Sequence, residues 1–270
     1  MKKTLRYFVM MLLLVSLSAL LFACGGGEES TTNDDDATAN DDEGEITKLV
    51  VGTDAAYAPM EYLDDKGDIV GIDIDIVDAI AEELDIEVEY KNVGWEPLFP
   101  AVDNGEVDFA VSSITITDER EESYDFTEPY YVANQLILVP EGSDITSFAD
   151  LKEGKKVSAQ INTTGHKVVQ DLLGETSSDI VAPETMPLAI TEMLNGNADA
   201  SVGDNSTVNE YIKNNPDAKV ETIEDDEFEK EYYGLMVKKG NDELRELLNE
   251  GIEKVKENGK LEEITGFVVE

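Results

Sequence analysis

The chain has 270 residues, of which 61 are Asp or Glu and only 20 are Lys or Arg, giving a formal net charge of −41 at pH 7. A surface this acidic repels phosphate groups, so nucleic acid is excluded as a natural partner. The single cysteine, Cys24, and the single histidine, His166, exclude a disulfide framework, histidine-based metal sites and catalytic triads. No cofactor is therefore expected, and a salt-rich habitat is one explanation for the charge.

The first 23 residues have the pattern of a lipoprotein signal peptide. A basic start is followed by an apolar run that is shorter than the ~20 residues a membrane span needs. The sequence Leu21-Phe22-Ala23 directly precedes Cys24 and forms a lipoprotein cleavage box. We expect removal of residues 1–23 and a lipid on Cys24 whose two acyl chains anchor the exported protein to the outer face of the cytoplasmic membrane. An ordinary signal peptide or an uncleaved anchor is the alternative.

Residues 24–45 are expected to form a disordered acidic tether after the lipidated cysteine. They contain no large apolar residue and many carboxylates, so they cannot bury a core. The run Asp34–Asp36 lacks the glycine turn and the spaced ligands of a calcium loop. About 225 residues remain from residue 46 onward, a length that suits two lobes.

The first part of this remainder alternates between strand and helix patterns. The expected elements are a strand over 48–53, a helix with Ile76, Val77, Ile80 and Leu84 on one face, a strand over 86–90, a helix from Pro97 to Asn104 and a strand starting at Phe109. Asp73, Asp75 and Asp78 stand near the start of the first helix, where carboxylates suit the helix dipole. This order predicts an α/β lobe with a parallel sheet.

The stretch FAVSSITITDERE, from Phe109 onward, is a hydroxyl-rich strand end that runs into a helical turn. Ser112, Ser113 and Thr115 offer hydroxyls and backbone N–H groups, and Arg120 offers a planar fork of donors. Together they are suited to holding a carboxylate bidentately. The alternative is that Arg120 only neutralises the acidic residues around it.

The second part of the chain repeats the alternation. Residues 125–139 look like a crossing between lobes, and INTTGHKVVQDLL is a loop opening a helix whose free N–H groups make an anion site. The remaining expected elements are a short helix and strand within 147–160, a helix over Met186–Leu194, a strand, turn and helix within 197–212, a return crossing near Tyr232, and helices over 242–258 and 261–267. Asp204 falls at a strand end, where its local role is that of a helix N-cap.

Several of these segments together resemble one known family. SSITITDER, YDFTEPYY, GTDAAYAPMEY, INTTG and ADASVGD are similar to the motifs of the polar amino-acid family of extracellular solute-binding proteins, the receptors of ATP-driven importers, over roughly residues 46–264. The resemblance implies an α/β fold of the type II periplasmic-binding-protein kind. Its two lobes are joined by two crossing strands, with lobe 1 over 46–131 and 232–270 and lobe 2 over 132–231. The lobes would close on a free amino acid and deliver it to an ABC permease, and a monomer is expected.

The resemblance also implies roles for single residues. Arg120 would grip the α-carboxylate with Ser113 and Thr115, and the threonines of INTTG would meet it from the second lobe. Asp204 would pair with the α-ammonium, while Tyr57 and Trp95 would sandwich the ligand side chain. The full ligand-binding set expected is Asp54, Tyr57, Glu61, Trp95, Ser112, Ser113, Thr115, Arg120, Gln160, Thr163, Thr164 and Asp204.

Two departures from the family pattern lie near these residues. Met60 stands where the family usually has phenylalanine, which concerns packing. Asn162 replaces a glycine of the QxGTTG segment, although asparagine tolerates left-handed backbone geometry.

The motifs look most like those of members that bind arginine, lysine or histidine. Tyr57 and Trp95 would stack on a guanidinium or a lysine stem, with Asp54, Glu61 or Glu96 as the distal charge partner. Glutamine or another neutral polar amino acid is the alternative, and acidic amino acids should be rejected. A dehydratase on the same architecture, with Glu61 as general acid, is the rival from another class, but no second acid/base residue is evident and the chain is not expected to be an enzyme.

Overall fold

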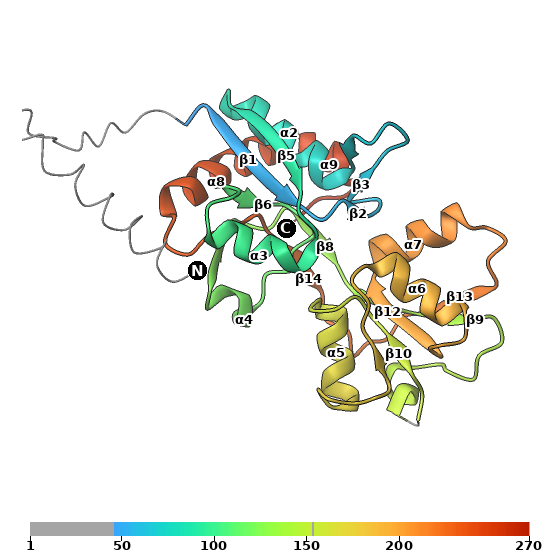
Figure 1. The fold of residues 1–270 in the computed structure, drawn as a ribbon. Coiled ribbons are helices and arrows are strands. Elements are labelled where there is room, and N and C mark those ends of the chain that lie inside the picture. The colour runs from blue at the N-terminus through green and yellow to red at the C-terminus, as the bar shows by residue number, and fades with distance from the viewer. Residues whose placement is uncertain (1–45, 153, 270) are drawn as a thin grey trace, which may run out of the picture. The chain divides into compact units, whose positions relative to one another are not determined.

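The computed structural model describes residues 46–152 and 154–269. The predicted signal peptide, the lipidation site Cys24 and the acidic tether lie outside the described residues. Among the helices that are described, none is both long and apolar enough to cross a membrane. The described chain forms two α/β lobes, which Figure 1 shows joined by a pair of strands.

The first lobe is built on a five-stranded sheet in the order β5-β1-β6-β15-β7. Strands β1, β5 and β6 are parallel, whereas β15 runs antiparallel between β6 and β7. The strands are β1 (Lys48–Thr53), β5 (Glu87–Asn92), β6 (Phe109–Ala110), β7 (Tyr124–Phe126) and β15 (Met236–Lys238). Because β15 comes from the C-terminal part of the chain, this lobe closes only after the chain has returned from the second lobe.

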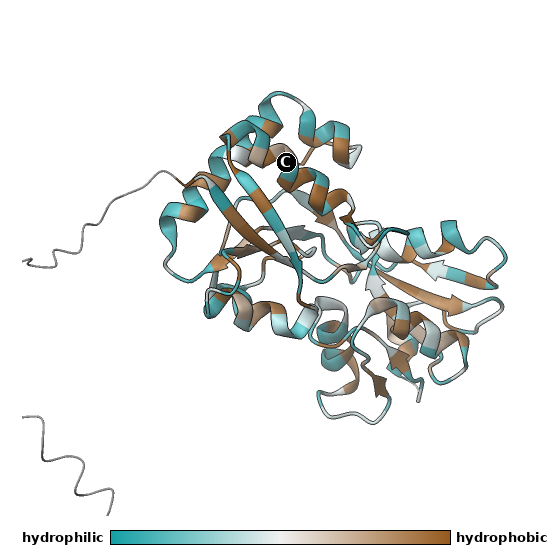
Figure 2. Cartoon of the chain, turned by 45° about the horizontal axis from the view of Figure 1, so that its top comes forward, coloured by the Kyte–Doolittle hydropathy of each residue, from teal (hydrophilic) through white to brown (hydrophobic). Residues whose placement is uncertain are grey.

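Helices cover both faces of this sheet because its inner strands β1 and β6 are apolar on both sides. Leu49 and Val51 pack in the cluster with α2 and α8, while Val50 packs with α3 on the opposite face. The helices of this lobe are α2 (Ile72–Leu84), α3 (Trp95–Asp103), the short α4 (Asp118–Glu121), α8 (Asp242–Glu257) and α9 (Lys260–Thr265). Figure 2 shows brown segments in the inner part of the sheet and teal on the outer faces of the helices.

The second lobe repeats this plan with a sheet in the order β11-β10-β12-β9-β13. Its first three strands are parallel, and β9 runs antiparallel between β12 and β13. The strands are β9 (Gln135–Pro140), β10 (Val157–Ser158), β11 (Ile180–Val181), β12 (Ala200–Asp204) and β13 (Val220–Ile223). The helices are η1 (Phe148–Lys152), α5 (Thr164–Leu173), α6 (Met186–Leu194) and α7 (Asn205–Asn214).

Two antiparallel strands form the crossing between the lobes. Strand β8 (Tyr131–Ala133) pairs with β14 (Glu231–Tyr233), and the rings of Tyr131 and Tyr233 stack with centroids 5.4 Å apart. A separate sheet of β2 (Ala56–Tyr57), β3 (Glu61–Leu63) and β4 (Ile69–Val70) lies before α2 and places Tyr57 opposite Glu61. The predicted α/β arrangement of two lobes with two crossing strands is therefore confirmed.

Most predicted elements are present, and several boundaries differ, two of them for a clear backbone reason. Helix α6 spans Met186–Leu194 as predicted, whereas α3 begins at Trp95 and not at Pro97, because Gly94 with φ 78° already turns the chain into the helix. The strand from Phe109 ends at Ala110. Ser113 has φ 49°, a left-handed conformation that a continuous strand cannot contain.

Candidate functional site

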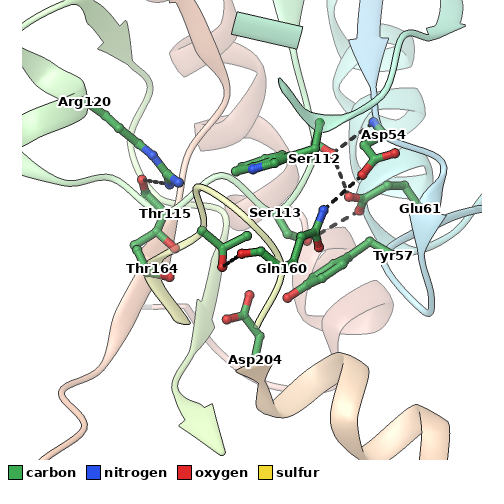
Figure 3. Close-up of a pocket in the computed structure, with 12 residues that line it drawn as sticks. Asp54, Tyr57, Glu61, Ser112, Ser113, Thr115, Arg120, Gln160, Thr164 and Asp204 are labelled. Atoms are coloured by element: carbon green, nitrogen blue, oxygen red, sulfur yellow. Dashed lines mark hydrogen bonds between the residues drawn. The ribbon is translucent and has the colours of Figure 1, made fainter. Parts of the chain in front are cut away.

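The twelve residues singled out from the sequence all line one pocket. They come from segments that follow strand ends of both lobes, where the carboxyl ends of parallel strands meet at one sheet edge. The Nε2 of Gln160 in the second lobe donates to Oδ2 of Asp54 in the first at 3.3 Å, so the lobes touch at this pocket. Figure 3 shows Arg120 on one side, Asp54 and Glu61 on the other, and Asp204 below.

Arg120 forms the cationic side of the pocket. The N-cap Thr117 accepts a hydrogen bond from the Arg120 N–H, and the guanidinium Nη1 donates to the carbonyl of Thr115 at 2.8 Å. The guanidinium carbon lies 5.4 Å from the ring centroid of Trp95. Within the described residues no ion pair joins Arg120 to its acidic neighbours in the sequence, so the interpretation that it only neutralises them is not supported.

The start of α5 faces Arg120 from the second lobe. Thr163 caps the helix by accepting from the N–H of His166 at 3.1 Å, so first-turn N–H groups near Thr164 have no partner within the helix. Asn162 has φ 58°, the left-handed conformation that its replacement of glycine requires. A Cβ on Gly165 would lie 2.7 Å from Oε1 of Gln135, so glycine allows the helix end to pack directly on β9.

Asp204 is buried at the end of β12 and does not act as predicted from local sequence. It occupies the N-cap position of α7, but its side chain makes no capping hydrogen bond. Its carboxylate instead accepts from Nε2 of Gln135 and from the hydroxyl of Tyr233, both at 2.5 Å. Burial, together with the charge of Glu231, raises the pKa of Asp204 above its usual range. The N-cap interpretation is therefore wrong, because the tertiary partners of Asp204 take its oxygens.

A cluster of three carboxylates, Asp54, Glu61 and Asp73, is buried on the side away from Arg120. Glu61 accepts from the hydroxyl of Ser112 at 2.8 Å, and Asp73 accepts from the N–H of Ser113 at 2.7 Å. Burial raises the pKa of Asp73 to about 6, that of Glu61 well above its usual range, and that of Asp54 as well. Within the described residues no ion pair involves any of the three, so neutral donors alone hold them.

The contacts of Asp73 correct one expectation. Asp73 lies in the first turn of α2 as predicted, but it is fully buried and also accepts from the hydroxyl of Tyr130 at 2.9 Å, so it is part of the wall behind the pocket. The N–H of Ser113 was expected to be free, but it is taken by Asp73. The left-handed conformation of Ser113 is what turns this N–H toward Asp73 and away from the sheet.

Tyr57 and Trp95 line the pocket, whereas Glu96 does not. Tyr57 and Trp95 are both buried and line the pocket, and Figure 3 shows the Tyr57 hydroxyl directed toward Asp204. Glu96 is exposed, does not line this pocket, and accepts from Nδ2 of Asn162 at 2.8 Å. The expectation that Glu96 is a charge partner inside the pocket is therefore wrong, since the first turn of α3 directs it outward.

Sequence reasoning missed a second group of polar residues at the crossing strands. Glu231 on β14 accepts from the hydroxyls of Thr115 and Thr164 at 2.7 and 2.8 Å, and from Nε2 of Gln135 at 2.9 Å. Tyr233, on the same strand, donates to Asp204. No local pattern identifies these residues, because each contacts partners far away in the sequence. The crossing predicted near Tyr232 was the one available signal.

Comparisons with known proteins identify the relatives of this chain. The family model of bacterial extracellular solute-binding proteins, family 3, matches residues 49–266. A probable histidine-binding protein of Neisseria gonorrhoeae is 39% identical over 214 residues, which are 79% of this chain and 80% of that protein.

Solved structures of similar proteins show the same fold. The arginine-, lysine-, histidine-binding protein ArtJ of Geobacillus stearothermophilus is 46% identical with a TM-score of 0.77, covering 81% of this chain and 93% of that one. An ancestral amino acid-binding protein, described as a precursor of cyclohexadienyl dehydratase, is 34% identical with a TM-score of 0.73, covering 80% of this chain and 93% of that one. This chain therefore has the type II periplasmic-binding-protein fold and belongs to the bacterial extracellular solute-binding proteins of family 3.

Proposed function

We propose that this protein is the receptor of an ABC importer for basic amino acids, namely arginine, lysine or histidine. The observation that carries the proposal is the buried cluster of Asp54, Glu61 and Asp73, which lies away from Arg120 and has no cationic partner among the described residues. Asp54 and Glu61 line the pocket, and Asp73 lies behind them. Burying carboxylates in this way costs free energy, as their raised pKa values indicate. A ligand with a positive charge at the end of its side chain removes that cost when it binds.

The remaining pocket residues suit the common part of an α-amino acid. Arg120 and the first-turn N–H groups of α5 are placed to hold the α-carboxylate from opposite lobes, and buried Asp204 is placed to hold the α-ammonium. Tyr57 and Trp95 provide aromatic surface for the side chain between them. Charge-assisted hydrogen bonds worth ~1.5–3 kcal/mol each are sufficient for micromolar or tighter binding after the cost of ordering the ligand.

Closure of the lobes provides the signal to the importer in this proposal. Contacts from Gln160 to Asp54 and from Arg120 to the carbonyl of Asn162 join the lobes across the pocket. A ligand that contacts both lobes stabilises this closed form, which a membrane permease can distinguish from the open one. We further propose that the exported chain is a monomer held at the membrane by a lipid on Cys24. Metabolic labelling with a clickable fatty acid, lost in Cys24→Ala, tests the anchor.

Glutamine is the second ligand considered. A side-chain amide can donate to Asp54 or Glu61, and it requires no charge on a Glu61 whose pKa is raised. Calorimetric titration of arginine, lysine, histidine, glutamine and glutamate at low and high salt separates these ligands. We expect the basic amino acids to bind tightest and glutamate not to bind. Glutamine binding tenfold tighter than arginine would contradict the basic-ligand proposal and leave the receptor role in place.

A dehydratase activity is the candidate from another functional class. Glu61 is fully buried with a raised pKa, as a general acid would be, and one structural relative is described as a precursor of a dehydratase. Against it, the named relatives are themselves binding proteins. Prolonged incubation with cyclohexadienyl amino acids, followed by NMR, tests this alternative, and we expect no turnover.

A further inference from the structure

We propose that Glu231 is a positioning residue for the α-ammonium group of the ligand. Its carboxylate accepts hydrogen bonds from the hydroxyls of Thr115 and Thr164, one from each lobe. The oxygen lone pairs of both threonines are therefore available to a ligand cation. The inference rests on the proposed amino-acid-binding function and adds a residue that does not itself line the pocket.

Glu231 lies where the two lobes and the crossing strands meet. It is the first residue of β14, and it is half-buried. Its Oε2 atom accepts from Oγ1 of Thr115 at 2.7 Å and from Oγ1 of Thr164 at 2.8 Å. Its Oε1 atom accepts from Nε2 of Gln135 at 2.9 Å. One carboxylate therefore connects the loop after β6, the first residue of α5 and the first residue of β9.

The direction of these hydrogen bonds follows from the number of protons available. A threonine hydroxyl has one proton and two lone pairs, and a carboxylate only accepts. Thr115 and Thr164 must therefore both donate to Glu231, and neither hydroxyl can donate to a ligand carboxylate at the same time. This differs from the expectation that the Thr115 hydroxyl binds the α-carboxylate. Both threonines line the pocket, so their remaining lone pairs are available there as acceptors.

The same network holds Asp204, the third acceptor for the ligand ammonium, in place. The Nε2 atom of Gln135 carries two protons and reaches Asp204 at 2.5 Å and Glu231 at 2.9 Å, with a longer contact of 3.3 Å to Oγ1 of Thr164. The two shorter contacts use both protons, so Thr164 keeps at least one free lone pair. An ammonium group has three donors, and Asp204, Thr115 and Thr164 offer it one acceptor each.

The charges around the network also favour one orientation of the ligand. Glu231 and Asp204 place two negative charges beside these hydroxyls, and the charge of Glu231 is one cause of the raised pKa of Asp204. Arg120 contacts Thr115 at its carbonyl oxygen, not at its hydroxyl. A ligand carboxylate is therefore favoured on the Arg120 side, and a ligand cation is favoured between the threonine hydroxyls and Asp204.

The test is a cycle that combines a protein substitution with removal of the ligand ammonium. Calorimetry gives the Kd values of L-arginine and of 5-guanidinopentanoate, which is arginine without its α-amino group, for the wild type and for Glu231→Gln. A glutamine amide can donate to the hydroxyls and reverse them. We expect the preference for arginine over the analogue to be about tenfold smaller in Glu231→Gln than in the wild type, because the variant binds arginine more weakly.

Two further variants separate the mechanism from general effects. Glu229→Gln makes the same charge change two residues away at an exposed position and should leave the preference unchanged. Glu231→Asp keeps the charge but is too short to reach both threonines, so its preference should also fall. It serves as the decisive variant if Glu231→Gln does not fold.

The outcomes are distinct. Equal weakening of both ligands, or an unchanged preference in the Glu231 variants, would overturn the role of Glu231 and leave the receptor function standing. A wild-type protein that binds neither arginine nor any other amino acid of the panel would overturn the proposed function, and this inference with it.

Discussion

The two lobes share one strand order but differ in what they bring to the pocket. Each sheet begins with three parallel strands, and the edge strand is the second of these three in chain order, β5 in lobe 1 and β11 in lobe 2. The other two strands of each sheet, β15 and β7 or β9 and β13, pair antiparallel. Lobe 1 contributes Arg120 and the buried carboxylates Asp54 and Glu61. Lobe 2 contributes hydroxyls, amides, a helix N-terminus and the single carboxylate Asp204.

In the proposed function, general recognition and selectivity depend on different groups. Arg120 of lobe 1, the groups of lobe 2 and the crossing strands suit features that all α-amino acids share. The carboxylates of lobe 1 have no cationic partner among the described residues and suit only a side chain that carries positive charge or donates hydrogen bonds. The shared topology therefore sets the position of the pocket, and we propose that the choice of ligand depends on a few acids of lobe 1.

The largest effect is expected from Arg120. Arg120→Ala should lower the affinity for every amino acid by more than about 100-fold, because it removes two charge-assisted hydrogen bonds to the α-carboxylate. Arg120→Lys should be nearly as severe, since a point charge does not replace a planar fork. Calorimetry and melting curves are measured together. A Kd within about threefold of the wild type for either variant would contradict the assignment.

The next largest effect is expected from Asp204. Asp204→Asn should weaken all α-amino acids alike, by about 10- to 100-fold, because it removes the charge that faces their shared ammonium. Thr185→Ala is a matched control at a helix N-cap of the same lobe, where the side chain does cap through the N–H of Leu188. The control should lose ~0.5–2 kcal/mol of stability and retain affinity. The opposite pattern in the two variants would restore the capping role of Asp204.

Selectivity should change at Glu61. Glu61→Gln keeps an oxygen that accepts from Ser112 but removes the buried charge, so the preference for arginine over glutamine should fall about tenfold. The raised pKa of Glu61 means that its ionised form destabilises the ligand-free protein at pH 7, so the variant should also melt at a higher temperature. An unchanged ratio of arginine to glutamine affinity would move the selectivity determinant elsewhere.

A smaller effect of pH follows from the same carboxylates. Their folded pKa values are raised, about 6 for Asp73, so the ligand-free protein binds protons more tightly than the unfolded chain between pH 4 and about 6. Stability from these groups is therefore fully present at low pH and decreases as the pH rises through that window. Arginine favours the ionised form, so its affinity should fall severalfold from pH 7 to pH 5. Asp73→Asn should flatten this dependence, measured by calorimetry in buffers of different ionisation enthalpy.

The smallest effect is expected at the edge of the pocket. Asn162→Gly keeps the left-handed backbone but removes the hydrogen bond to Glu96 between the lobes. Because both partners are exposed, the loss should be about two- to threefold in Kd, through faster release. Glu96→Ala should give a similar loss, and the double variant should lose no more than either single one. Additive losses would show that the two residues act separately.

The sequence by itself determined the elements and most of the pocket. A short apolar run defines the buried strand β1 and the helical spacing of apolar residues in α2 defines a buried helix face, and these patterns depend only on local geometry. Arg120 and the INTTG segment were identified because hydroxyls, a guanidinium and a helix start are chemically distinctive wherever they fold. The resemblance to a known family then supplied an order for the pieces.

Only the tertiary structure decided what the buried acids contact. Helical spacing places Asp73 on the face of Ile76 and Ile80 and places Asp75 and Asp78 on the exposed face, but only the structure shows that Ser113 and Tyr130 donate to the buried Asp73 carboxylate. The hydrogen bond from Thr115 to Glu231 joins residues 116 positions apart, and the contacts of Asp204 with Gln135 and Tyr233 likewise arise when the crossing strands pair. The environment of a carboxylate is set by the side chains that surround it in space, and its neighbours in sequence do not specify them.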